Sequence, residues 1–312
     1  METPRLDVEI AGIRFRNPLI LASGIADETG ASMAEAVNNG AGGVVTKSLS
    51  LEPRDGHGNP CIVELPHGLI NAMGLPNPGI KDFEEEIGLF LRSTRGGAPI
   101  IGSVFGSTLE EYALAAGRIG DMGVHGVELN GSCPNAKGLG LQFGQDPMVI
   151  EDLVREVKRS VKVPVFFKLT PACSNIADLA LAAQMGGADG VVAINTMPAM
   201  MIEVRTRRPV LTNVTGGLSG PALRPIGVRC VYEIANSGRI RVPIIGVGGI
   251  STWEDALEYM MAGASAVQVG TAVTWGNLRV FREIAEGMVS FMKEQRIRRV
   301  QDIIGAARGV KG

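Results

Sequence analysis

The sequence has little of what marks a disulfide-stapled, zinc-binding or nucleic-acid-binding protein. It contains four cysteines among 312 residues, and they are widely spaced with no Cys-X-X-Cys pair. A disulfide framework or a zinc site is therefore not expected, and a reducing compartment fits this cysteine usage. The formal net charge of −2 argues against a polyanion such as nucleic acid as the partner.

Targeting and membrane signals are also missing. Residues 1–10 show no basic segment followed by an apolar run, so no signal peptide is expected. No stretch of about 18 uncharged apolar residues occurs, so no membrane span or membrane contact is expected. With 45% apolar and 20% charged residues, the chain has the composition of a globular protein, and we expect it in the cytoplasm.

Eight short apolar runs recur along the chain, and an amphipathic stretch follows each. The runs lie at residues 18–22, 43–47, 100–105, 126–130, 165–169, 190–195, 243–247 and 266–270. They lack polar alternation, as is typical of parallel strands buried on both faces. Eight strand–helix units in series predict an α/β fold, a single (β/α)8 TIM-barrel domain over residues 1–312. A doubly wound open sheet is the alternative.

Two segments are too long for simple connections and are interpreted as insertions. Residues 49–79 follow the second run, and residues 197–221 follow the sixth. A further inserted loop is expected after the fourth run. All would lie at the carboxyl ends of strands, where barrel enzymes build their active sites, although such loops can also be decoration.

Polar residues stand at or near the ends of most of these runs. They are Ser23, Lys47, Ser48, Ser103, Asn130, Lys168, Asn195 and Thr196. A lysine within an apolar run, such as Lys168, is costly to bury unless a partner compensates it. One such side chain could simply extend to the surface. The set as a whole predicts a site at one rim of the barrel.

Glycines follow the last two runs. Gly248 and Gly249 come after the seventh run, and Gly270 and Thr271 after the eighth, while residues 216–220 form another glycine-rich loop. Backbone amides in such loops can face an anion, which predicts a phosphate-binding site. No Gly-X-Gly-X-X-Gly follows the first run, so a Rossmann fingerprint is excluded.

Two groups of reactive side chains leave alternatives open. Cys133 follows the fourth run and could act as a base or nucleophile once ionised, although many loop cysteines are inert. His57, Cys61 and His67 lie close in sequence and could ligate a metal. We interpret this second group as a polar surface loop and expect no metal.

The sequence resembles the dihydroorotate dehydrogenase family of class 1, most of all its NAD-linked class 1B type, from about Leu6 to about Met292. The motifs that carry the resemblance are Asn71-Ala-Met73-Gly74-Leu75-Pro-Asn-Pro-Gly, Asn130-Gly-Ser-Cys133-Pro-Asn135, Lys168-Leu-Thr-Pro, Ile194-Asn195-Thr196, Gly217-Leu-Ser-Gly220-Pro-Ala and Gly246-Val-Gly248-Gly249-Ile. They occur in this order after the expected strands.

The resemblance implies FMN-dependent oxidation of dihydroorotate to orotate in pyrimidine biosynthesis. Cys133 would be the catalytic base, and Lys168 would stabilise charge on the flavin. The flavin contacts implied are Ser23, Lys47, Ser48, Ser103, Asn130, Lys168, Ile194 and Gly220, with Gly248, Gly249, Gly270 and Thr271 at its phosphate. The substrate contacts implied are Lys47, Asn71, Met73, Gly74, Leu75, Asn130, Asn135, Asn195 and Thr196.

The NAD-linked type works with a separate subunit that carries FAD and an iron–sulfur cluster, so the resemblance implies such a partner, and we expect a homo-oligomer. The chain departs from the family in residues 58–64, which lack an arginine, and at Ser103 and Ala172. Residues 138–147 also resemble dihydropyrimidine dehydrogenases, so oxidation of another dihydropyrimidine is the alternative. A lyase that uses Lys168 as a Schiff base, or a non-catalytic barrel subunit, are further alternatives.

Overall fold

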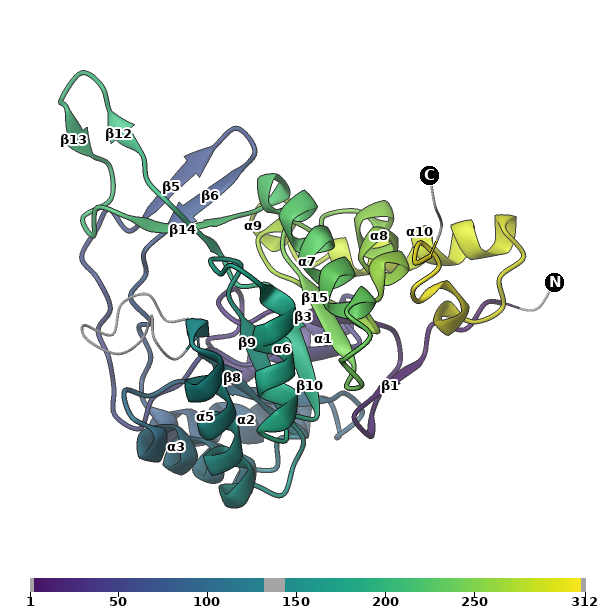
Figure 1. Ribbon diagram of the computed structural model, residues 1–312, viewed down its shortest axis with the longest axis horizontal. Coiled ribbons are helices and arrows are strands. Elements are labelled where there is room, and N and C mark those ends of the chain that lie inside the picture. Colours follow the sequence, from purple (N-terminus) through teal and green to yellow (C-terminus); the bar gives the residue numbers. More distant parts are fainter. Residues whose placement is uncertain (1–2, 132–143, 310–312) are drawn as a thin grey trace.

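Eight parallel strands close into a barrel in the computed structural model, which describes residues 3–131 and 144–309 (Figure 1). The strands are β3 (Leu19–Leu21), β4 (Gly43–Val45), β7 (Ile100–Val104), β8 (Gly126–Asn130), β9 (Val165–Leu169), β10 (Gly190–Ala193), β15 (Ile244–Val247) and β16 (Ala266–Val269). Each lies within one predicted run. The last strand pairs with the first, Val267 opposite Leu19, so the barrel prediction is confirmed and the open sheet is wrong.

Helices surround the barrel. They are α1 (Gly30–Asn38), α2 (Ile80–Ser93), α3 (Leu109–Asp121), α5 (Pro147–Ser160), α6 (Ile176–Met185), α7 (Arg224–Asn236), α8 (Trp253–Ala262), the short α9 (Ala272–Gly276) and α10 (Val280–Glu294). Polar side chains start several of them: Thr108 accepts the Glu111 amide, and Asp146 accepts the Met148 amide. These caps satisfy amides that the first helical turn leaves without partners.

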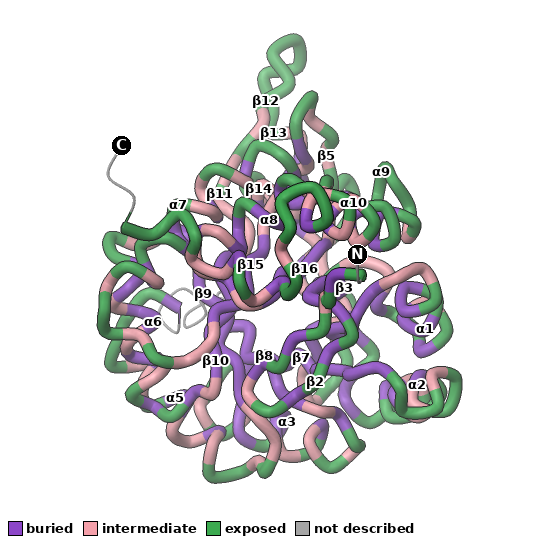
Figure 2. Tube along the Cα trace, turned by 90° about the vertical axis from the view of Figure 1, so that its right-hand side faces the viewer, coloured by how far each residue is buried: buried purple, intermediate pink, exposed green. Residues whose placement is uncertain are grey.

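The core lies between the strands and the inner faces of the helices (Figure 2). Every residue of β7, β8 and β9 is buried, which explains the absence of polar alternation in those runs. Close packing sets residue size locally. A Cβ on Gly190 would lie 2.7 Å from Cδ1 of Phe166, so only glycine fits there without a shift of the ring.

An N-terminal hairpin covers the end of the barrel where the strands begin. Its strands are β1 (Val8–Ile10) and β2 (Ile13–Phe15). A Cβ on Gly43, the first residue of β4, would lie 2.6 Å from the Phe15 ring, and one on Gly126, the first residue of β8, would lie 3.1 Å from Ile13. The hairpin therefore packs against this end and leaves the opposite rim for a site.

The two long segments that follow β4 and β10 pair with each other. Strands β5 (Ile62–Leu65) and β6 (Gly68–Asn71) come from the first, and β11 (Met197–Ala199) and β14 (Gly216–Ser219) from the second. They form one antiparallel sheet in the order β11-β14-β6-β5, with a small core of Ile70, Ala72 and Leu211. The expected loop after β8 includes residues 132–143, which lie outside the described residues.

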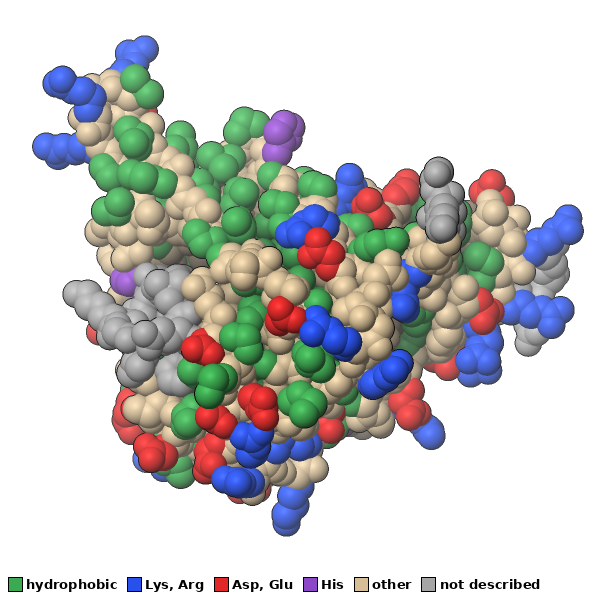
Figure 3. Space-filling model, in the orientation of Figure 1, with side chains coloured by type: hydrophobic (Ala, Val, Ile, Leu, Met, Phe, Trp, Pro, Cys, Tyr) green, Lys and Arg blue, Asp and Glu red, His purple; other side chains and the backbone are tan. Residues whose placement is uncertain are grey.

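A second hairpin, β12 (Ile202–Glu203) and β13 (Arg208–Pro209), projects from this sheet. Arg205, Arg207 and Arg208 are exposed, and basic side chains gather at its tip (Figure 3). The remaining elements are the 3-10 turns η1 (Pro221–Leu223) and η2 (Val300–Ile303). Within residues 3–131 and 144–309, no helix combines the length and apolar character needed to cross a membrane.

Packing of α2 against the barrel provides a test of this core. Phe90 is fully buried, whereas its neighbour Leu89 is 36% exposed. We expect Phe90→Ala to lower the free energy of unfolding by about 3–5 kcal/mol, because it leaves a cavity. The matched Leu89→Ala should cost less than about 1 kcal/mol. Urea denaturation followed by circular dichroism measures both; equal losses would contradict the assigned helix face.

Candidate active site

Five polar side chains from five strand ends form one hydrogen-bonded chain along the rim. Ser23 Oγ lies 3.3 Å from Ser48 Oγ, which lies 2.8 Å from Ser103 Oγ. Asn130 Nδ2 donates to Ser48 Oγ at 3.1 Å, and Asn195 Nδ2 donates to Asn130 Oδ1 at 3.1 Å. The structure thus brings together residues up to about 170 positions apart, as expected when parallel strands all end at one rim. The chain also sets the orientation of the Asn130 amide.

Lys168 on β9 lies in the barrel interior as part of a buried network. Its Nζ donates to Glu128 Oε1 at 3.1 Å and to Gln268 Oε1 at 3.4 Å. Gln268 Nε2 in turn donates to Glu128 Oε2 at 2.7 Å. All three side chains are buried, so the interpretation of Lys168 as a surface-reaching side chain is wrong. An ammonium has three donor protons, and two of them have acceptors within residues 3–131 and 144–309, so in this part of the chain one remains for a bound group.

Glu128 and Gln268 were missed as site residues by the sequence reasoning. Both stand inside apolar runs, which is the same signal that identified Lys168. A carboxylate and an ammonium on neighbouring strands and an amide from across the barrel compensate one another, and three separate polar anomalies could have been interpreted as one cluster. Thr46 was missed as well: its hydroxyl accepts the Ser103 amide at 2.9 Å and supports the rim chain.

Acidic residues after β3 surround the predicted site residue Lys47. Its Nζ lies 3.1 Å from Glu28 Oε1, and the Lys47 side chain is only 12% exposed. Asp27 is fully buried; its Oδ2 accepts the Gly24 amide, and its Oδ1 has no hydrogen-bond partner among the residues that the structure describes. Burial raises the pKa of Asp27 to about 6, although the Gly24 amide and the Lys47 charge oppose this. The sequence reasoning did not identify Asp27 or Glu28.

The glycine loops after β15 and β16 have the properties of an anion cradle. Gly248 has φ 128° and Gly249 φ 71°, and Gly220 in the neighbouring loop has φ 91°. A Cβ on Gly249 would lie 2.6 Å from the Gly220 carbonyl oxygen, so side chains are excluded. In the described chain, the amides of Gly248, Gly249, Gly270 and Thr271 donate to no protein acceptor. Glycine loops with uncommitted amides fit a phosphate group.

The next amides along this loop are already engaged. Ser251 and Thr252 both donate their backbone amides to Asp255 Oδ2, at 2.8 and 3.0 Å. Asp255 also pairs with Arg224. An anion would therefore contact the amides before Ser251 rather than the first turn of α8.

The antiparallel sheet β11-β14-β6-β5, called the upper sheet below, connects with the rim. Asn71 on β6 pairs with Gly217 on β14, and its Nδ2 donates to the Gly217 carbonyl at 3.4 Å. A Cβ on Gly217 would lie 2.0 Å from Thr196 Oγ1, so Thr196 lies directly against this strand. The Thr196 amide donates to Asn195 Oδ1 at 2.8 Å, which joins the upper sheet to the rim chain. Three predicted substrate residues therefore lie together.

The other predicted residues have mixed outcomes. Met73 and Gly74 contact the segment before β5: the Met73 carbonyl accepts the His57 amide, and the Gly74 carbonyl accepts from Arg54 at 2.6 Å. Leu75 follows them with a positive φ of 57°. Ile194 is buried and binds the Val247 carbonyl through its amide. Cys133 and Asn135 lie outside the described residues.

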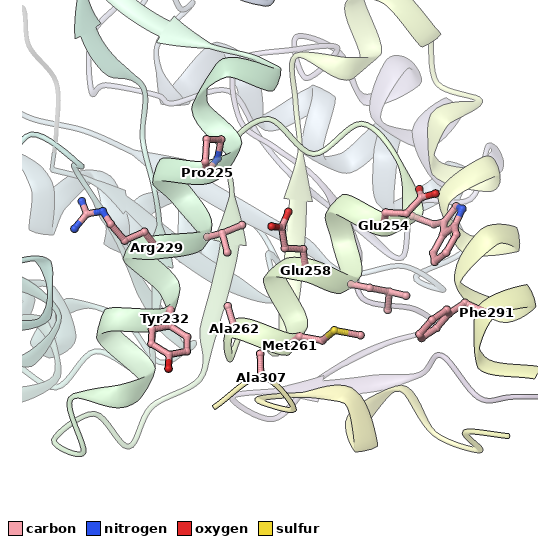
Figure 4. A pocket seen from close by; sticks show the side chains of 12 residues that line it. Pro225, Arg229, Tyr232, Glu254, Glu258, Met261, Ala262, Phe291 and Ala307 are labelled. Atoms are coloured by element: carbon pink, nitrogen blue, oxygen red, sulfur yellow. The ribbon is translucent and has the colours of Figure 1, made fainter. Parts of the chain in front are cut away.

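Two other features stand apart from the rim. In the part of the chain that the structure describes, no group of three His, Cys, Asp or Glu residues could hold a metal, so His57, Cys61 and His67 form no such cluster. A groove of about 650 Å³ lies among α7, α8 and α10, where Tyr232, Met261 and Phe291 line it (Figure 4). None of the predicted site residues lines this groove.

Comparisons with known proteins agree over most of the chain. The model of the family described as dihydroorotate dehydrogenase matches residues 5–292. The chain is 51% identical over 302 residues to the dihydroorotate dehydrogenase B (NAD(+)) catalytic subunit of Pyrococcus abyssi, covering 97% of this chain and 99% of the relative. It is 52% identical over 303 residues to the same subunit of Thermoplasma acidophilum, covering 97% and 98%. For that of Methanocaldococcus jannaschii the identity is 46% over 303 residues, covering 97% and 98%.

Removing one partner from the buried network should destabilise the fold. We expect Lys168→Met to lower the free energy of unfolding by about 3–5 kcal/mol, because Glu128 then lies buried without a compensating cation. The double variant Lys168→Met/Glu128→Gln should recover much of this loss. Urea denaturation at pH 7 measures both, and additive losses in the double variant would refute the coupling.

The buried Asp27 carboxyl should make stability depend on pH. Its folded-state pKa of about 6 lies above the ordinary value of 3.8, so between these values the folded state binds more protons and stability falls as pH rises. Asp27→Asn removes this loss. Its stability relative to the wild type should therefore rise by up to about 3 kcal/mol between pH 4 and 7.5. Denaturation across this range tests it, with exposed Asp121→Asn as control; a difference that does not vary with pH contradicts it.

Proposed function

Because the chain belongs to the dihydroorotate dehydrogenase family, we propose that it oxidises (S)-dihydroorotate to orotate with FMN as its cofactor. It is an oxidoreductase acting on a CH–CH bond, of the NAD-linked type B. The observation that carries the proposal is the buried Lys168–Glu128–Gln268 network at the same rim as the polar chain. A cation held inside an apolar barrel is what a cofactor that becomes anionic on reduction requires.

The cofactor would lie over the rim with its phosphate at the glycine loops. The amides of Gly248, Gly249, Gly270 and Thr271 would donate to the phosphate, and Gly220 would flank it. Ser23, Lys47, Ser48, Ser103, Asn130, Lys168 and Ile194 would hold the rest of the molecule. When bound, FMN supplies an acceptor for the hydride that leaves C6 of the substrate.

Lys168 would stabilise the negative charge that develops at N1 and O2 of the flavin. Glu128 compensates the charge of Lys168 inside the protein, and Gln268 fixes the direction of both side chains. The ammonium is therefore already oriented before the reaction, so no reorganisation is needed as charge develops.

Asparagine amides would recognise the substrate. Asn130 and Asn195 are oriented by their contacts in the rim chain, and side-chain amides carry the donors and acceptors that match a cyclic diamide. Lys47 would pair with the substrate carboxylate, in competition with Glu28. Further contacts would come from Asn71, Met73, Gly74, Leu75, Asn135 and Thr196.

Cys133 would act as the base. Its thiolate would take the proton from C5 while the hydride leaves C6, and a C5=C6 double bond forms. The thiol then holds that proton at Sγ and returns it to solvent. This role comes from the family motif Asn130-Gly-Ser-Cys133-Pro-Asn135.

The relatives are named catalytic subunits, which supports a separate partner subunit for this chain. We infer that the partner carries FAD and an iron–sulfur cluster and passes electrons to NAD. The complete chain would act as one FMN-binding domain, in a homo-oligomer in the cytoplasm.

Anaerobic flavin reduction tests this function. We expect the FMN-loaded protein to lose its yellow colour on addition of dihydroorotate, but not with dihydrouracil or dihydrothymine. Cys133→Ala should retain FMN yet be reduced about 10²–10⁴ times more slowly at neutral pH, because the proton on C5 has no base. Stopped-flow absorbance measures both rates.

The outcomes separate the alternatives. Faster reduction by dihydrouracil would make the protein a dehydrogenase of another dihydropyrimidine. An unchanged rate in Cys133→Ala would remove Cys133 as the base while leaving the substrate assignment intact. A protein that cannot be loaded with FMN would overturn the proposal itself.

A further inference from the structure

The tip of the β5–β6 hairpin is fastened beside the glycine cradle. Glu64 on β5 accepts a hydrogen bond from Trp275 Nε1 on α9 at 2.9 Å, across 211 residues of sequence. The His67 carbonyl in the hairpin turn accepts the Ala222 amide of η1 at 2.9 Å. Two hydrogen bonds thus tie the tip of this hairpin to segments that follow β14 and β16.

These ties converge on the residues predicted to hold a phosphate. A Cβ placed on Gly220 would lie 2.8 Å from Gly68 Cα, 3.4 Å from Trp275 Cη2 and 3.5 Å from Thr271 Cγ2. Gly249 also packs against Gly220, since a Cβ placed on Gly249 would lie 2.6 Å from the Gly220 carbonyl oxygen. The hairpin, the indole edge and the glycine loops therefore meet at one corner of the rim.

Neither Trp275 nor Glu64 is placed to support the core. Trp275 is 46% exposed, and Glu64 lies on the exposed edge of the sheet. A large aromatic ring held half-exposed contributes little to the buried core, and its Cη2 atom lies against Gly220 of the glycine loops. The hydrogen bond from the indole nitrogen keeps the ring in this position.

We propose that Trp275 and Glu64 form a clasp that holds the β5–β6 hairpin against the phosphate-binding corner and slows the release of FMN. The proposal rests on the proposed function, because it takes the group held at the glycine loops to be FMN. Trp275 acts as a positioning residue: its ring closes one side of the corner, and Glu64 fixes the ring. Neither residue takes part in the oxidation of the substrate.

The test compares the rate of FMN release among variants of the full chain. Trp275→Ala removes the ring, Trp275→Phe keeps a ring but loses the N–H donor, and Glu64→Ala removes the acceptor. Tyr232→Ala is the matched control, since Tyr232 is also a partly exposed aromatic but lies on α7 in the distant groove. Loaded protein is diluted into excess riboflavin-binding protein, and the fluorescence change reports release.

We expect Trp275→Ala to release FMN about ten times faster than the wild type, which corresponds to about 1.4 kcal/mol. Trp275→Phe and Glu64→Ala should release FMN at rates between those of Trp275→Ala and the wild type. Glu64→Gln, which keeps an acceptor oxygen, should retain the wild-type rate. Tyr232→Ala should release FMN at the wild-type rate. The melting temperature of the FMN-free variants should stay unchanged.

Release at the wild-type rate from Trp275→Ala, Trp275→Phe and Glu64→Ala would overturn the clasp. If Trp275→Ala lowers the melting temperature, Trp275→Phe and Glu64→Ala decide the question. Should the wild-type protein itself fail to bind FMN, the proposed function fails, and this outcome is distinct from normal binding with unchanged release in the variants.

Discussion

The buried contact between Lys168 and Glu128 is the interaction on which the rest of the site depends. An ammonium inside a barrel of apolar strands is unfavourable unless a counter-charge and hydrogen bonds replace the water that it loses. Glu128 supplies the charge from the neighbouring strand, and Gln268 contacts both from β16 on the other side of the barrel. The network therefore spans the bore of the barrel and also places one cationic group just below the rim.

In the rim chain next to this network, polar side chains likewise satisfy one another by hydrogen bonds. Hydroxyls of Ser23, Ser48 and Ser103 satisfy one another, and Asn130 and Asn195 extend the chain to the far strands. A side chain that is already oriented by its neighbours loses little freedom when a ligand binds. Because the β1–β2 hairpin packs against the opposite end, the polar surface of the barrel is concentrated at this rim.

A second constraint acts at the glycine loops. Gly220, Gly248 and Gly249 adopt positive φ values and approach one another too closely for side chains. Among the described residues their amides donate to no protein acceptor, while Asp255 accepts hydrogen bonds from the amides that follow. The loop after β15 thus has two parts: Gly248 and Gly249 are available to an anion, and Ser251 and Thr252 cap α8. The β5–β6 hairpin lies against Gly220, which packs on Gly249.

The sequence by itself determined the barrel and most of the rim. The eight apolar runs can be recognised in the sequence because parallel strands buried on both faces show no polar alternation. Each polar residue at the end of such a run can be recognised separately for the same reason. What only the tertiary structure decided is how distant residues pair. Glu128, Gln268, Asp27 and the Glu64–Trp275 contact each depend on a neighbour that lies far away in sequence or on the degree of burial. No local pattern encodes these relations, because they arise only when the strands close and the two long segments fold onto each other.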